Sequence, residues 1–346
     1  MNADLEHCRA AIRTGSLSFH TASLLLPQRV RDPALVLYAF CRLADDAVDL
    51  QQDKTTAVLS LRDRLEAAYR GQPRNTPVDR AFAVMIEAEE MPRALPDALL
   101  EGLAWDAMGR RYETFDDLMD YCARVASAVG AMMCVLMKAR GADALARATD
   151  LGLAMQMTNI ARDIGEDAHE GRLYLPLEWM DEAGIDINRF HSDPQPTEAT
   201  RALTRRLLRR ADDRYASAVA GISVLPASCR IGIMSALLIY RAIGGEITKA
   251  EYDSITRRAR TSRRRKLGLL LAAMGRVGLQ FTLPQSAVLY RKPHQSCAFL
   301  VEAATREQPA GALQTRADAL VEALAQLEAS RRARQSGLLN DASGVT

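Results

Sequence analysis

The amino-acid sequence predicts an all-α protein that folds as one helical bundle. Residues that favour helices, among them Ala, Leu, Arg, Glu and Met, are prominent, whereas aromatic residues make up 5% of the 346 residues. Alternating runs of β-branched residues, which are typical of strands, are scarce. Prolines fall between segments with helical apolar periodicity, as at positions 27, 33, 73, 77, 92, 96, 176, 194, 196 and 226.

Residues 34–49 predict a buried helix that ends in a pair of carboxylates. The run from Ala34 to Ala44 is largely apolar, and Asp45 and Asp49 follow it four residues apart. Residues at that spacing share one face of a helix, where like charges repel by roughly 0.2–0.5 kcal/mol unless a cation lies between them. A solvated acidic face is the alternative for a single pair of this kind. Acids at the end of an apolar helix, however, favour a cavity wall.

Residues 151–167 predict a second helix of the same kind. One stripe on this helix carries polar side chains at steps of three, four and four residues: Gln156, Asn159, Asp163 and Asp167. Carboxylate and amide oxygens are hard ligands suited to Mg²⁺, which usually bridges carboxylates and the oxygens of a phosphate. Arg42 and Arg162, beside the two acid clusters, carry guanidinium groups that fork onto phosphate oxygens. Two such helices facing each other across a dry cavity predict a site for a diphosphate ester with an apolar tail.

A basic run over residues 257–266 precedes the apolar residues 267–274. Such a run is either a solvated helix end or a patch that meets anionic lipid, where each basic side chain contributes about 1 kcal/mol. Nucleic-acid binding is not expected, because the net charge is only +2 and no aromatic residues interleave with the arginines.

The remaining features of the sequence indicate the domain organisation, the state of the cysteines and the location of the protein. We expect a catalytic domain over residues 1–290 and an extension over residues 291–346, which contains a helix at 317–335 and a flexible tail. The six cysteines form no CxxC pair and are expected to be reduced. Because the N-terminus lacks a signal-peptide pattern and no apolar stretch reaches about 20 residues, we expect a cytoplasmic protein without a membrane span.

Several of these segments resemble the squalene/phytoene synthase family, and most closely its bacterial phytoene-forming members. The most specific are residues 38–49, 151–167 and 171–176, and weaker ones are 16–19, 25–27, 111–115 and 121–130. They occur in the family's order, and the resemblance extends over roughly residues 14–290.

The resemblance implies a class I isoprenoid synthase (prenyltransferase) fold with a central apolar cavity. It implies a head-to-head condensation of two geranylgeranyl diphosphate molecules through prephytoene diphosphate to phytoene, with release of diphosphate, as the first committed step of carotenoid biosynthesis. Mg²⁺ is the expected cofactor, with Mn²⁺ as a substitute, and no nicotinamide cofactor is expected. Contact with membrane lipid at the inner face of the membrane and with downstream carotenoid enzymes is a further expectation.

The resemblance also implies roles for individual residues. Tyr121 is the candidate for handling the proton that is lost in cyclopropane formation. The expected metal ligands, of which the aspartates also count as catalytic, are Asp45, Asp49, Asn159, Asp163 and Asp167. The expected diphosphate contacts are Ser16, Ser18, Tyr38, Arg42, Gln156, Arg162 and Tyr240. Leu17 stands where some relatives carry a lysine, and Arg29 or Arg31 is expected to replace its charge.

Three alternatives remain open at this stage. A farnesyl diphosphate-using enzyme would give squalene, dehydrosqualene or presqualene diphosphate, and the depth of the cavity would distinguish it. Met132, Met133 and Met155 are candidate liners of that cavity, although methionines at helical spacing are often core residues. A di-iron bundle is suggested by Glu166 and His169 but would need a second Glu-x-x-His motif. A non-catalytic scaffold would tolerate the loss of Asp45 and Asp163.

Overall fold

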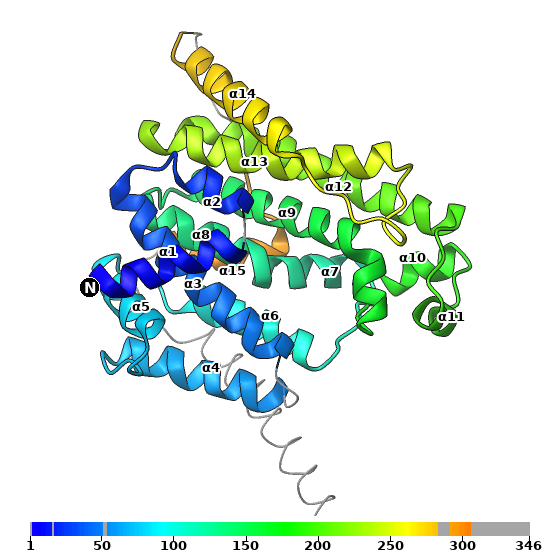
Figure 1. Ribbon diagram of the computed structural model, residues 1–346, viewed down its shortest axis with the longest axis horizontal. Helices are drawn as coiled ribbons and strands as arrows, with labels where there is room; N and C mark the ends of the chain where they lie inside the picture. Colours follow the sequence, from blue (N-terminus) through cyan, green and yellow to red (C-terminus); the bar gives the residue numbers. More distant parts are fainter. Residues whose placement is uncertain (1, 16, 51–53, 283–290, 306–346) are drawn as a thin grey trace, which may run out of the picture.

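The computed structural model describes residues 2–15, 17–50, 54–282 and 291–305, and this part of the chain is helical without strands. Figure 1 shows the longest helix, α9 (Ala142–His169), running through the middle of the molecule. The N-terminal helices and the later helices pack around it. The predicted all-α bundle is therefore confirmed.

In the described part of the chain, the bundle consists of α-helices joined by short turns, with one π-helical and two 3₁₀ segments. Before α9 the elements are α1 (Asn2–Gly15), α2 (Leu17–Ser23), α3 (Gln28–Leu50), α4 (Lys54–Tyr69), α5 (Pro77–Ala88), α6 (Ala94–Ala107), α7 (Phe115–Cys122), η1 (Ala123–Ser127) and α8 (Ala128–Leu136). After α9 they are α10 (Leu177–Glu182), α11 (Ile187–Ser192), α12 (Glu198–Gly221), η2 (Ile222–Val224), α13 (Ala227–Lys249), α14 (Arg263–Thr282), η3 (Gln295–Cys297) and α15 (Ala298–Thr305).

Glycines allow α9 to approach its neighbours closely. A Cβ atom on Gly152 would lie 2.5 Å from the Cα atom of Ser127, at the end of η1. A Cβ atom on Gly165 would lie 2.7 Å from the Cα atom of Ile255, and the Gly165 N–H donates to the carbonyl of Ser254 at 2.9 Å. Helix α9 is thus held between the π-helical segment on one side and the loop before α14 on the other.

Helix α3 buries the apolar run that precedes the first acid cluster. Leu37, Phe40 and Ala44 are at most 1% exposed, and the ring of Phe40 stacks on that of Phe82 at 3.9 Å between centroids. The expectation that prolines separate the helices is wrong at Pro33, which lies inside α3. It occupies the sixth position, where it cannot donate the helical backbone hydrogen bond, but the helix continues to Leu50.

The apolar residues 125–137 contribute to both the core and the wall of the cavity described below. Tyr121 precedes η1, the π-helical turn, a kind of bulge that is frequent at functional sites. The stretches Phe115–Leu136 and Ala227–Lys249 are long and apolar enough to cross a membrane, but 61% and 56% of their apolar windows are buried inside the protein. The absence of a membrane span stays a prediction.

The described part of the C-terminal extension packs onto the bundle. Leu300 and Ala304 of α15 are fully buried, and α15 contacts α6, α8 and α9. The expected helix at 317–335 and the tail lie outside the described residues. All six cysteines are free, and five of them are buried.

Candidate active site

A cavity of about 720 Å³ follows α9 through the bundle. Its α9 wall runs from Ala144 to Arg162, and α3, η1, α8, α12 and α13 form the other sides. The interior is mostly apolar. The cavity is lined by these predicted site residues: Tyr38, Arg42, Asp45, Tyr121, Gln156, Asn159, Arg162 and Tyr240.

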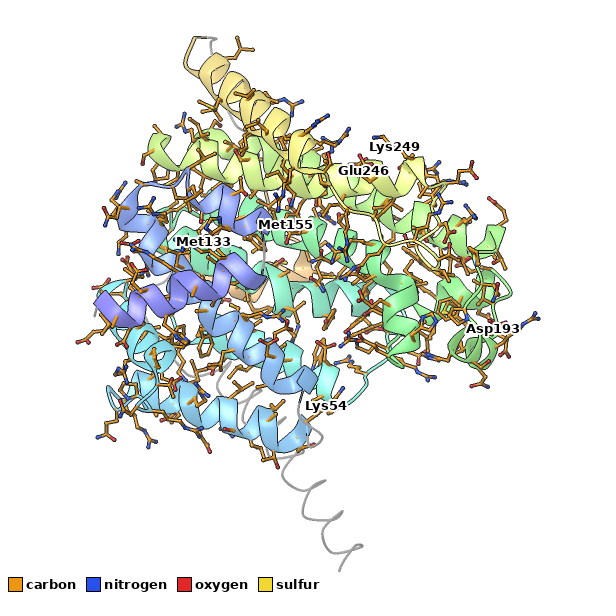
Figure 2. All side chains as sticks on the ribbon, in the orientation of Figure 1. Lys54, Met133, Met155, Asp193, Glu246 and Lys249 are labelled. Atoms are coloured by element: carbon orange, nitrogen blue, oxygen red, sulfur yellow. The ribbon has the colours of Figure 1, made fainter. Side chains whose placement is uncertain are left out.

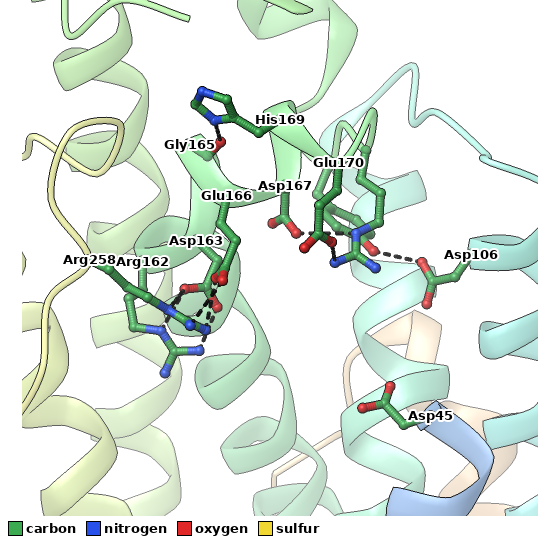
Figure 3. A network of polar contacts seen from close by, with 12 residues as sticks. Asp45, Asp106, Arg162, Asp163, Gly165, Glu166, Asp167, His169, Glu170 and Arg258 are labelled. Atoms are coloured by element: carbon green, nitrogen blue, oxygen red, sulfur yellow. Dashed lines mark hydrogen bonds and ion pairs between the residues drawn. The ribbon is translucent and has the colours of Figure 1, made fainter. Parts of the chain in front are cut away.

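At the rim of this cavity, Asp163 lies between two arginines (Figure 3). The Nε of Arg162 donates to Asp163 Oδ1 at 2.8 Å, and the Nε of Arg258 donates to the same oxygen at 2.8 Å. Arg258 also contacts Glu166, with Nη2 3.0 Å from Oε2. Burial raises the pKa of Asp163, but the hydrogen bonds and charges of the two arginines outweigh it and lower the pKa below the usual value.

Asp167 lies one turn further along α9, where fewer positive charges balance its own charge (Figure 3). Its nearest cation is Arg172, whose Nε is 3.4 Å from Asp167 Oδ1. Burial raises the pKa of Asp167 to about 7, against the lowering effect of Arg172, and the charge of Asp163 adds to the increase. This carboxyl therefore exchanges a proton near neutral pH and gains from a further cation.

The first acid cluster is more open. The side chain of Asp45 is 51% exposed, and its Oδ2 lies 3.7 Å from Nη1 of Arg42. Arg42 makes its closer contact with Asp46, with Nη2 2.7 Å from Oδ1. Helix α3 continues through Asp49, which keeps its backbone one turn beyond Asp45. Ser16 and the side chains of Ser18 and Asp49 lie outside the described residues.

Asp106 of α6 lines the cavity and links two tyrosines, and no sequence pattern had selected it. The hydroxyl of Tyr121 donates to Asp106 Oδ2 at 2.9 Å, and that of Tyr174 donates to Oδ1 at 2.8 Å. Burial raises the pKa of Asp106 to about 6, against the lowering effect of both hydroxyls. Burial likewise raises the pKa of Tyr121 well above its usual value. Tyr121 is thus a neutral phenol oriented by a buried carboxyl.

Aromatic and sulfur-containing side chains line the apolar part of the cavity. The ring of Phe19 lies 5.1 Å from that of Tyr240 and 6.2 Å from that of Tyr38. Met133 and Met155 both line the cavity and lie in the middle of the bundle in Figure 2. Met132, the third expected liner, does not. It is fully buried in the core, because its helix turns it away from the cavity.

Several sequence-based expectations take a different form in the structure. The basic residues 257–266 do not all belong to one surface patch, because Arg258 binds Asp163 at the mouth of the cavity. Neither Arg29 nor Arg31 lines the cavity. The di-iron alternative has no support, since Glu166 faces Arg258 while His169 contacts the carbonyl of Gly165. Among the described residues no three His, Cys, Asp or Glu side chains come together as a ready-made metal site.

An all-helical bundle with an apolar cavity and with arginines, aspartates and amides at the cavity mouth defines an enzyme of the isoprenoid synthase class. The comparison with known proteins makes the assignment narrower. The profile of the squalene/phytoene synthase family matches residues 12–265. The chain belongs to the squalene/phytoene synthase family, and it is a transferase of prenyl groups.

Individual relatives agree with this assignment. The chain is 56% identical to a phytoene synthase of Cereibacter sphaeroides over 341 residues, which cover 96% of this chain and 95% of the relative. It is 57% identical to a phytoene synthase of Rhodobacter capsulatus, with coverage of 95% and 97%. A solved dehydrosqualene synthase aligns with a TM-score of 0.74 and 32% identity, covering 80% of this chain and 98% of that structure.

Proposed function

We propose that this protein condenses two molecules of geranylgeranyl diphosphate head to head into phytoene. The observation that carries the proposal is the combination of the site with the two relatives named phytoene synthase, which match almost the whole chain at 56% and 57% identity. The mouth of the cavity offers arginines for diphosphate, and the interior offers an apolar channel for the tails.

The length of the cavity supports the longer of the two candidate substrates. From Asn159 to Ala144 the α9 wall spans 15 residues, which is about 22 Å of helix. An extended tail of four isoprene units is about 19 Å long and one of three units about 14 Å, if each backbone bond advances the chain by about 1.2 Å. A geranylgeranyl tail therefore uses nearly the whole channel, whereas a farnesyl tail leaves its deep part empty.

The chain's own residues account for the ionisation of the substrate. Arg42 and Arg162 bind the diphosphate and stabilise the charge that it gains as it leaves. The apolar walls exclude water, which would otherwise capture the allylic cation. The second substrate molecule then attacks that cation to form the cyclopropane ring. Tyr121 accepts the proton that this step releases, while its own hydroxyl proton passes to the carboxylate of Asp106.

Magnesium fits the donors at the mouth. Asp45, Asn159, Asp163 and Asp167 offer carboxylate and amide oxygens, which Mg²⁺ prefers and which Mn²⁺ also accepts. Bound there with the substrate, the metal would neutralise the diphosphate and make it a better leaving group. The carboxylates stand on opposite helices, and the described residues alone do not form a ready-made metal site, so the metal would bind together with the diphosphate.

The identity of the hydrocarbon tests the proposal. Purified protein is incubated with Mg²⁺ and geranylgeranyl diphosphate without a nicotinamide cofactor, and the extract is analysed by mass spectrometry. Phytoene is the expected product. Formation of squalene or dehydrosqualene from farnesyl diphosphate alone, or of a cyclopropyl diphosphate that advances only after addition of NADPH, would reject it in favour of the squalene-forming alternative.

We also propose that α14 lies against anionic lipid, close to where a hydrocarbon product must be delivered. One face of α14 packs on α13 through Ala273 and Val277, which are at most 1% exposed. Another face presents Leu267 and Leu271, which are 61% and 63% exposed. The helix contains no acidic residue and opens with Arg263, Arg264, Arg265 and Lys266. Exposed leucines beside an unbroken set of positive charges are typical of helices in the lipid interface.

A vesicle-binding assay tests this surface. The protein is expected to float with vesicles that contain phosphatidylglycerol and to be released by high salt. The double variant Leu267→Gln/Leu271→Gln should lose most of this binding, and Val84→Gln, which changes another exposed apolar residue, should retain it. Equal binding by both variants would contradict the role of α14. Contact with downstream carotenoid enzymes stays a prediction.

A further inference from the structure

The deep end of the cavity contains a buried arginine that the reaction does not use. Arg147 lines the cavity and is 8% exposed. It lies 12 residues before Asn159 on α9, and therefore about 18 Å from the mouth. The other charged liners all belong to the mouth: Arg42, Asp45, Asp106, Arg162 and Arg258. Around Arg147 the wall is made of small and apolar residues, among them Ala144, Ala148 and Ile222.

Contacts from two helices fix the position of Arg147. Its Nε donates to Asp143 Oδ2 at 3.0 Å, and its Nη1 donates to the carbonyl of Ser217, on α12, at 3.1 Å. A Cβ atom on Gly221 would lie 2.5 Å from the Cβ and 2.6 Å from the Cδ of Arg147. The alkyl part of Arg147 thus fills the space that the glycine leaves, and the guanidinium is held between α9 and α12.

The C-terminal extension holds the same end of the cavity. The backbone N–H of Arg291 donates to Asp143 Oδ1 at 3.0 Å, so Asp143 contacts Arg147 and the extension at once. The Nε of Arg291 lies 2.8 Å from Oδ2 of Asp150, a carboxylate that is 1% exposed and also bonds Arg214 at 3.1 Å. Arg291 lies beyond residues 12–265, the part that the family profile matches.

We infer that Arg147, held by Asp143 and Arg291, closes the tail channel and sets the longest prenyl chain that the enzyme accepts. The inference rests on the proposed function, because it assigns the substrate tails to this channel. A tail one isoprene unit longer would have to displace a buried guanidinium from its contacts with Asp143 and the carbonyl of Ser217. Arg147 is therefore a specificity residue. Arg291 is a positioning residue, because the ion pair of its side chain with Asp150 anchors the backbone N–H that binds Asp143.

The test compares diphosphates of 15, 20 and 25 carbons on the full-length protein. We expect the wild type to prefer the 20-carbon substrate and to leave the 25-carbon one unused. Arg147→Ala should raise the ratio of kcat/KM for the 25-carbon over the 20-carbon substrate at least tenfold, and a product from two 25-carbon units should appear. Arg291→Ala removes the ion pair with Asp150 but keeps the backbone N–H, so it should raise the same ratio by a smaller factor. Arg241→Ala, which removes an exposed ion pair with Asp212, should leave it unchanged.

A variant with the opposite effect keeps the test decisive if Arg147→Ala does not fold. Ala148→Phe leaves the ion pairs in place but fills the channel next to Arg147. It should favour the 15-carbon over the 20-carbon substrate at least tenfold. Unchanged ratios in the folded variants, while the wild type still makes phytoene, would overturn the inference alone. A wild type that makes no phytoene would instead reject the proposed function.

Discussion

The carboxylates at the two ends of the cavity along α9 differ in how closely arginines pair with them. At the mouth, Asp163 binds two arginines, and Asp167 is buried with one distant cation at 3.4 Å. At the deep end, the described carboxylates and guanidiniums are paired at 2.8–3.1 Å, as in the contacts of Asp150 with Arg291 and Arg214. The mouth therefore has a carboxylate, Asp167, that a metal can still neutralise, whereas the charges at the deep end already neutralise one another.

The largest effect is expected from a carboxylate at the mouth. Asp45→Asn should lower kcat by at least about 10²-fold, because a neutral amide cannot take part in neutralising the leaving diphosphate. The side chain is half exposed, so the free energy of unfolding should change by less than about 0.5 kcal/mol. Steady-state kinetics and thermal unfolding check the two numbers. Asp193→Asn, an exposed aspartate far from the cavity, is the control, and equal activities would contradict the role of Asp45.

At the deep end, a substitution should lower stability and leave the ionisation step intact. Asp150→Ala leaves Arg214 and Arg291, which are both partly exposed, without their buried partner and should cost about 1–3 kcal/mol of stability. The folded fraction should still ionise geranylgeranyl diphosphate, since no mouth residue changes. Denaturant unfolding and diphosphate release per folded molecule measure the two effects. A stable variant without activity would show that the two ends are not separable in this way.

Between the two ends, the Tyr121 hydroxyl is predicted to serve a single step. Tyr121→Phe should slow hydrocarbon formation by about 10²-fold, the range of a lost acid–base group, and leave the first release of diphosphate faster than product formation. Single-turnover assays of diphosphate and hydrocarbon separate these rates. An equal decrease in both would mean that the phenol positions substrate and handles no proton.

The smallest effect is a pH dependence at the mouth. Because burial raises the pKa of Asp167 to about 7, the metal-free folded state binds a proton that the unfolded state releases near pH 4. The stability without metal should therefore fall as the pH rises from about 4 to 7. Mg²⁺ affinity should rise up to tenfold per pH unit over the same range, since the metal competes with that proton. Asp167→Asn should flatten both curves, which calorimetry can follow.

The sequence alone was sufficient to predict the two helices on which acidic residues recur at a spacing of four. The four-residue spacing of acids on two apolar helices predicts the mouth, and the structure brings Asp45, Asn159 and Arg162 to one cavity. Asp106 could not be found in this way, because it is a single acid that gains its role only when folding brings Tyr121 and Tyr174 to it.

Two arginines were missed for the same reason. Arg258 stood in a run of basic residues, and only the contact of its loop with Gly165 turns it toward Asp163. Asp143 and Arg147 have the four-residue spacing of a surface ion pair, and only the packing of α12 through Gly221 buries Arg147. Local spacing predicts which residues share a helix face, but burial depends on which helix covers that face.

The most direct test of the central claim offers the enzyme both substrates together. Equal concentrations of farnesyl and geranylgeranyl diphosphate are supplied with Mg²⁺, without a nicotinamide cofactor, and the hydrocarbons are separated by chain length. The account predicts phytoene, with 40 carbons, as the dominant product. A dominant 30-carbon product would contradict it, because the deep part of the channel would then have no function in choosing the substrate.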